Sequence, residues 1–123
     1  MAYTTIDDPS VYFQTTLYTG NGGTQSITNT GNSDLQPDWI WIKSRNEAEH
    51  HNLVDSVRGN TKVVYTSLTG GEDTTSIQVT SFASDGFALG SGTNTNKNTI
   101  TYAAWQWKAG TSFTNDASST GIG

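Results

Sequence analysis

All four tryptophans of the chain lie in two Trp-x-Trp pairs, Trp39 with Trp41 and Trp105 with Trp107. Residues i and i+2 point to the same face of a β-strand, so this spacing favours two strands over helices. Ile40 lies between the first two tryptophans, which makes both faces of that strand apolar, as is typical of a strand covered on both sides. We therefore expect the indole rings to point inward and to join two sheets around one core.

The same geometry has an alternative interpretation. Tryptophans at i and i+2 that point outward form an aromatic platform on which sugar rings stack. In the second pair, Gln106 and Lys108 indicate that one face of the strand is in contact with water. Trp105 and Trp107 are therefore the candidate platform of a carbohydrate-binding module, with a host-surface glycan as its ligand.

Composition predicts an all-β chain of one domain. The 123 residues include 13 glycines and only 33% hydrophobic residues, and much of the remainder is Thr, Ser and Asn, which favour strands and tight turns. We expect a two-sheet antiparallel β-sandwich of jelly-roll type. Residues 76–82 and 86–89 are predicted to form a hairpin, and 25–29 is the candidate hairpin partner of 15–19. Strands are predicted at 15–19, 25–29, 39–43, 53–54, 62–68, 76–82, 86–89 and 99–107, while 90–98 is predicted to be a loop.

Charge limits the classes of partner. The formal net charge is −5 and the sequence pI is about 4.6, which argues against a nucleic-acid backbone or an anionic membrane surface as partner. No stretch of the sequence is apolar enough to span a bilayer. The chain has no cysteine, which excludes disulfides and cysteine-ligated zinc. We expect neither nucleic-acid nor membrane binding.

Side chains that catalyse reactions or bind metals are few and scattered. His50 and His51 are adjacent, so in extended backbone their rings point to opposite sides and do not converge on one metal ion. Asp55 and Arg58 flank a turn, which a charge-assisted hydrogen bond between them would brace. There is no Gly-x-Ser-x-Gly motif and no spaced acid pair for hydrolysis of a polysaccharide. We expect no catalytic residue, no metal site and no cofactor.

The chain divides into three parts on composition. Residues 1–14 are predicted to be an extended N-terminal arm, and residues 15–110 are predicted to be the β-sandwich domain. Residues 111–123 are small and polar and are predicted to be a linker to further C-terminal modules.

Several strings of the sequence resemble the N-terminal module of large virion structural proteins of marine tailed bacteriophages. The resemblance spans nearly the whole chain. It rests on the strings at residues 3–14, 17–22, 34–43, 55–59, 84–87 and 102–110 and on the stretch from Trp107 to Gly123. In that family the last stretch leads into repeated jelly-roll modules of lectin-like or SPRY-like type.

The resemblance implies a non-enzymatic capsid-decoration, appendage or tail-fibre protein that is located in the virion. It implies attachment to other virion proteins, of the capsid or the tail, through the N-terminal region, and no catalytic residue is carried over. We also expect a symmetric homo-oligomer. The candidate docking residues are Tyr3, Ile6, Val11, Tyr12 and Phe13.

Overall fold

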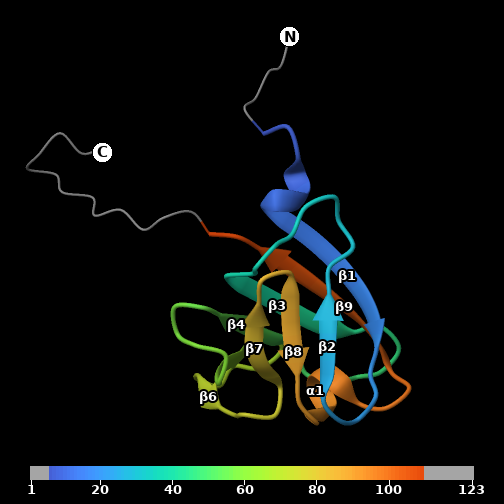
Figure 1. Ribbon diagram of the computed structural model, residues 1–123. Helices are drawn as coiled ribbons and strands as arrows, with labels where there is room; N and C mark the ends of the chain where they lie inside the picture. Colours follow the sequence, from blue (N-terminus) through green and yellow to red (C-terminus); the bar gives the residue numbers. More distant parts are fainter. Residues whose placement is uncertain (1–5, 110–123) are drawn as a thin grey trace, which may run out of the picture.

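The computed structural model describes residues 6–109, which form two antiparallel sheets packed face to face (Figure 1). The elements are a 3-10 turn η1 (Pro9–Val11), strands β1 (Phe13–Thr19), β2 (Gln25–Thr28), β3 (Trp39–Ser44), β4 (Asn52–Asp55), β5 (Lys62–Tyr65), β6 (Asp73–Thr74), β7 (Val79–Ala83) and β8 (Gly86–Leu89), helix α1 (Thr93–Asn96) and strand β9 (Thr101–Trp107). This confirms the predicted all-β class with two antiparallel sheets.

The larger sheet has the strand order β1-β9-β3-β4-β5-β6 and the smaller one β2-β8-β7. The two tryptophan strands, β3 and β9, are neighbours inside the larger sheet, with β1 beside β9 at the margin (Figure 1). The smaller sheet covers one face of the larger one. The jelly-roll type of this sandwich stays a prediction.

One predicted hairpin is confirmed and one is wrong. β7 and β8 pair as an antiparallel hairpin, with a register shift between Val79 and Ser81. By contrast, β1 pairs with β9 and β2 pairs with β8, so β1 and β2 lie in different sheets. The chain changes sheet at Gly20, whose N–H donates to Ile100 O (2.8 Å) and whose carbonyl accepts from Thr99 N–H (3.0 Å). These bonds hold the turn against the start of β9 instead of letting it close a hairpin.

Several element boundaries differ from expectation: the predicted strands 62–68 and 76–82 are Lys62–Tyr65 and Val79–Ala83 in the structure. Two further differences lie in the first strand and in the stretch 90–98. The first strand begins at Phe13 and not at Thr15, so the last two residues of the predicted arm belong to the sandwich. The stretch 90–98 contains the four-residue helix α1 and not only loop. In both places the difference comes from long-range hydrogen bonds, which local composition does not encode.

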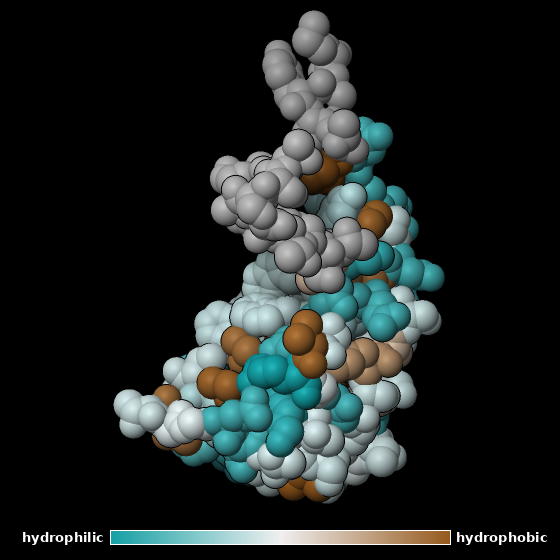
Figure 2. All heavy atoms as spheres, turned by 90° about the vertical axis from the view of Figure 1, so that its left-hand side faces the viewer, coloured by the Kyte–Doolittle hydropathy of each residue, from teal (hydrophilic) through white to brown (hydrophobic). Residues whose placement is uncertain are grey.

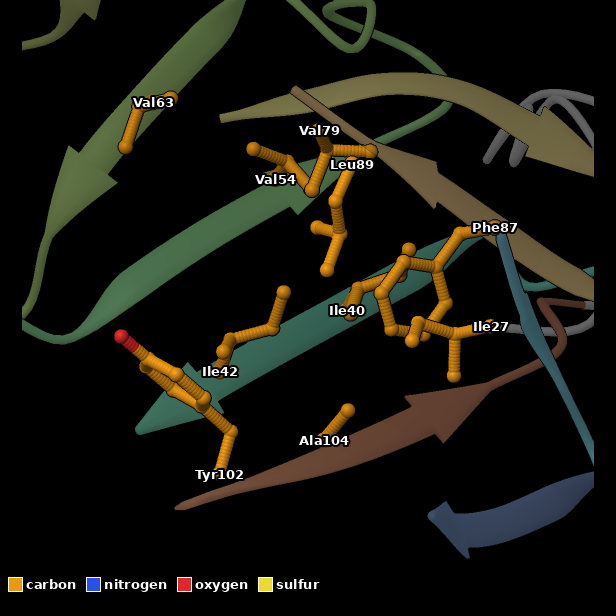
Figure 3. Packing of buried hydrophobic residues seen from close by; sticks show 10 residues of the cluster. All are labelled: Ile27, Ile40, Ile42, Val54, Val63, Val79, Phe87, Leu89, Tyr102 and Ala104. Atoms are coloured by element: carbon orange, nitrogen blue, oxygen red, sulfur yellow. The ribbon is translucent and has the colours of Figure 1, made fainter. Parts of the chain in front are cut away.

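The core lies between the two sheets (Figure 3). Its side chains come from the inward positions of both sheets and are nearly or completely buried. They are Ile27, Ile40, Ile42, Val54, Val63, Val79, Phe87, Leu89, Tyr102 and Ala104. None of the four tryptophans is among them.

A buried polar cluster lies beside this core and joins β1, β9 and the residue that follows β2. Gln106 is completely buried, and its Nε2 donates to Asn29 Oδ1 (2.6 Å) and to Thr16 Oγ1 (3.1 Å). Asn29 Nδ2 donates in return to Gln106 Oε1 (3.2 Å) and to Leu35 O (3.1 Å), so both ends of each amide are used. Because buried amides are tolerated only when paired, this cluster holds Gln106 on the inner face of β9.

Candidate functional site: an outward aromatic face

The tryptophans lie on the outer face of the larger sheet, which corrects the expectation that they fill the core. Ile40 and Ile42, the inward positions of β3, are fully buried, whereas Trp39 and Trp41 on the other face are half-buried. On β9, Trp105 is half-buried and Trp107 is 37% exposed. Figure 3 shows the inward side chains of these strands pointing toward the smaller sheet.

The tryptophans lie outside because other side chains fill the layer between the two sheets. Stacked sheets are separated by roughly 10 Å, and β-branched Ile40 and Ile42 fill that layer together with Phe87 and Leu89 from the smaller sheet. Since side chains alternate along a strand, the inward position of Gln106 places both Trp105 and Trp107 on the outside. The three-stranded sheet covers only the inner face of the larger one.

The strand register brings the outward rings together. Trp39 and Phe13 lie on either side of Trp107 in neighbouring strands, and Trp41 lies opposite Trp105. The ring centroids are 4.3 Å apart for Trp39 and Trp107, 4.8 Å for Phe13 and Trp107, and 5.3 Å for Trp41 and Trp105. We call these five residues the aromatic face: Phe13, Trp39, Trp41, Trp105 and Trp107.

The rings of the aromatic face are inclined to one another. The interplanar angles are 73° between Trp39 and Trp107, 49° between Phe13 and Trp107 and 40° between Trp41 and Trp105. Edge-to-face and tilted pairs are favourable for the rings themselves. Such pairs cover part of each ring and form an uneven apolar ridge instead of a flat plane.

Charged side chains border the aromatic face at the β4–β5 turn. Arg58 Nε donates to Asp55 Oδ2 (2.6 Å) and Arg58 N–H donates to Asp55 Oδ1 (2.9 Å), which confirms the predicted turn brace. Arg58 also forms an ion pair with Glu72 (3.1 Å). Burial raises the pKa of Asp55, but the hydrogen bonds and the charge of Arg58 outweigh it, so the net pKa is lowered. This border is charged at neutral pH.

The candidate docking residues of the N-terminal segment are largely exposed. The exposed fractions are 46% for Ile6, 50% for Tyr12 and 39% for Phe13, whereas Val11 is half-buried in η1. Tyr3 lies outside the described residues. Phe13 belongs to the aromatic face through its contact with Trp107, so the structure joins part of the predicted docking segment to the predicted platform.

Asp8 anchors this N-terminal segment to the loop before β3. Its carboxylate accepts hydrogen bonds from the Ser10 hydroxyl (2.6 Å), the Ser33 hydroxyl (2.6 Å) and the Asn32 amide (3.0 Å). These bonds, led by the one from Ser10, hold the pKa of Asp8 well below its usual value of 3.8. The segment is therefore held against the domain by an ionised carboxylate.

Acid should loosen this anchor. Because the pKa of Asp8 is lowered in the folded state, its contribution is fully present above pH 3.8 and is lost as the pH falls further toward the lowered value. We expect Asp8→Ala to shift the amide resonances of Ser10 and Ser33 at pH 7, with Asp7→Ala, a change at its exposed neighbour, as the matched control. An NMR titration measures both effects. If Asp8→Ala leaves the Ser33 resonance unchanged, the anchor does not exist in solution.

The two histidine rings lie near aromatic rings. The His50 ring lies 5.6 Å from the Tyr65 ring and the His51 ring lies 6.5 Å from Trp41, as centroid distances. Within residues 6–109 there is no group of three or more His, Asp or Glu side chains that could bind a metal ion. In the same range, no pocket is present and no helix is long and apolar enough to cross a membrane.

Apolar side chains elsewhere on the described surface are exposed singly or in small groups. Figure 2 shows the side on which β4 and β6 lie in Figure 1, and its described side chains are mostly polar or weakly polar, with apolar ones in small groups. Val57, 93% exposed in the turn between β4 and β5, is an example of a single exposed apolar residue. Scattered residues of this kind are normal on a protein surface.

Fold and surface define a small all-β sandwich domain with an aromatic outer sheet face. The sequence matches, over residues 8–121, a family described as a domain of unknown function (DUF7483), and the chain belongs to that family. No curated protein and no solved structure matches it significantly. The family description assigns no activity.

Proposed function

We propose that this domain is a non-enzymatic structural component of a bacteriophage virion, of capsid-decoration, appendage or fibre type, which attaches to another virion protein. The attachment surface that we propose consists of Phe13, Trp107 and Trp39 of the aromatic face together with Ile6 and Tyr12. The observation that carries the proposal is the row Phe13–Trp107–Trp39, which crosses three neighbouring strands on the outside of the sheet.

Physical reasoning supports a protein contact at this row. Tryptophan and tyrosine are enriched at the centres of protein interfaces, where they contribute much of the binding energy. The tilted rings form an uneven apolar surface, which suits a complementary side-chain surface better than a flat sugar ring. The absence of a pocket within residues 6–109 is also typical of a contact surface that is broad and shallow.

The proposal predicts where the protein is found and how it is held there. Mass spectrometry of purified particles of the phage that encodes the chain should detect it as a regular component. Trp107→Ser with Phe13→Ser should weaken attachment by about 2 kcal/mol, roughly thirtyfold in affinity, measured by re-binding of purified protein to particles that lack it. Ile77→Ser is the matched control, since it removes an exposed apolar side chain just before β7 of the smaller sheet, on the opposite side of the larger sheet from the row. Particles without this protein would overturn the virion assignment.

A second candidate, a carbohydrate-binding module, is favoured by the outward position of Trp105 and Trp107, the predicted platform residues. Trp41 adds a third indole to this side, and its Nε1 donates to Thr66 Oγ1 (3.0 Å). In this function the charged border at Asp55 and Arg58 would supply the hydrogen bonds that orient a sugar.

A glycan array separates the two functions. Attachment to a virion protein predicts no retained glycan for the unmodified domain. Carbohydrate binding predicts a retained glycan whose binding is lost with Trp105→Ala and survives Ile6→Ser, because Ile6 lies on the N-terminal segment and not on the platform. Circular dichroism shows whether each variant keeps its sheets.

A further inference from the structure

Strand β1 forms a free edge of the larger sheet. It pairs with β9 on one side, and no strand of the described part pairs with it on the other. Unpaired strand edges present rows of N–H and C=O groups that can accept another strand, so proteins usually protect them with charges, prolines, bulges or short length.

The other sheet edges have such protection and β1 does not. β6 has two residues, β2 has four, and β7 contains a register shift between Val79 and Ser81. β1 has seven residues, pairs with β9 without a register shift, and contains neither a charged residue nor a proline. It is the one long, regular and uncharged edge among the described strands.

The hydrogen-bond pattern shows which backbone groups of β1 face outward. At one end of the strand Lys108 N–H donates to Tyr12 O, and at the other Gly20 N–H donates to Ile100 O, both at 2.8 Å. Pairing alternates along an antiparallel strand, so the even-numbered residues of β1 face β9 and the odd-numbered ones face away. The outward-facing residues with no backbone partner in the described part are Phe13, Thr15 and Leu17.

Thr19, the next odd-numbered residue, has a partner already. Its carbonyl accepts a hydrogen bond from Gln25 Nε2 (3.1 Å). The free row therefore ends at Leu17 on this side and begins at Phe13 on the other, and its central residue is Thr15.

We infer that β1 pairs antiparallel with β1 of a second copy of this chain, with Thr15 on the two-fold axis. Phe13 then lies opposite the partner's Leu17, and Thr15 lies opposite the partner's Thr15. Each of these three residues forms two backbone hydrogen bonds with the residue opposite, one through its N–H and one through its C=O. The two larger sheets become one continuous sheet.

The side chains of β1 favour a second copy over a foreign strand. The outward sequence apolar–Thr–apolar reads the same in both directions, as a two-fold contact requires. Phe13 and Leu17 are 39% and 59% exposed, and together they would form apolar cross-strand pairs. Although the chain carries a net charge of −5, β1 has no charge to face its own copy across the axis.

The inference goes beyond the proposed attachment. The two share the Phe13 side chain, but the pairing uses backbone groups of β1 that the aromatic face does not need. Light scattering after size exclusion should give twice the chain mass of 13.2 kDa. Thr15→Pro removes the N–H at the axis, which does not point at β9, and Leu17→Lys places a charge opposite the partner's Phe13. Both variants should give the mass of a single chain. Thr80→Lys, on the edge strand β7, is the matched control and should keep the doubled mass.

Hydrogen exchange of the unmodified chain provides a test that needs no variant. The amides of Phe13, Thr15 and Leu17 should be protected at high protein concentration and should exchange rapidly on dilution, whereas the amides of Gln14 and Thr16, bonded to β9, should stay protected throughout. A single-chain mass at all concentrations, or unprotected Thr15 in a doubled species, would overturn the inference. The first result excludes a dimer, and the second places the contact elsewhere.

Discussion

Asn96→Asp is expected to lower the free energy of unfolding by about 4 kcal/mol at pH 7, because it leaves a buried charge without a counter-ion. Asn96 is completely buried in α1. Its Nδ2 donates to Gly23 O (2.6 Å), Gly90 O (2.8 Å) and Asn21 Oδ1 (3.1 Å). The aspartate would present an oxygen to these three oxygens.

The loss of stability in Asn96→Asp should be largest at high pH. Burial and the surrounding acceptors raise the pKa of the new carboxyl group in the folded state, so protonation relieves the repulsion. A group whose pKa is raised in this way destabilises the fold most at high pH, and the difference from the original chain should shrink as the pH falls to about 4. Urea denaturation at pH 7 and pH 4, followed by circular dichroism, measures both values.

Asn98→Asp is the matched control for this variant. It makes the same chemical change two residues away, at an exposed position of the same connection. We expect a change within about 0.5 kcal/mol, as for most surface substitutions. Equal losses in the two variants would mean that the hydrogen bonds of Asn96 do not hold the β1–β2 turn to α1.

Gly86→Ala is expected to cost about 3 kcal/mol of stability, from backbone strain and overpacking together. Gly86 begins β8 and has φ +121°, a conformation that residues with a Cβ rarely adopt. A Cβ placed there would lie 2.0 Å from the carbonyl oxygen of Ile27 on the neighbouring strand β2. That oxygen is backbone and cannot turn away.

Alanine substitutions at two other glycines distinguish the cost of backbone strain from the cost of steric overlap. Gly59 has φ +97° but nothing within 4 Å of an added Cβ, so Gly59→Ala should cost about 1 kcal/mol from strain alone. Gly70 has an open surrounding and no positive φ, so Gly70→Ala should be neutral or slightly stabilising. Thermal and urea unfolding of the three variants measures their losses of stability and ranks them. A Gly86→Ala loss no larger than that of Gly59→Ala would contradict the close contact with Ile27.

Local sequence patterns were sufficient for the strands whose partners lie nearby in the chain. The β7–β8 hairpin follows from period-two alternation around the Ser84–Gly86 turn, and the β4–β5 turn follows from Asp55 and Arg58 beside a glycine. Both depend on interactions within a few residues, which the order of amino acids encodes directly.

Pairings between strands that are far apart in the chain could not be predicted from local sequence patterns. The sequence offered residues 25–29 as a hairpin partner for the first strand, but β1 pairs with β9, about ninety residues later in the chain. The turn at Gly20 bonds to Ile100 and Asn21 bonds to Asn96. These contacts exist only after the two ends of the domain have met.

The order of amino acids by itself determined that the tryptophans lie in strands, two on each, with each pair on one face, because side chains alternate along an extended backbone. Only the tertiary structure decided which face that is. Both faces of β3 are apolar, so its pattern permitted either orientation. The inner layer accepts Ile40 and Ile42 beside the buried amides of Gln106 and Asn29, and this choice leaves the indole rings on the outer surface.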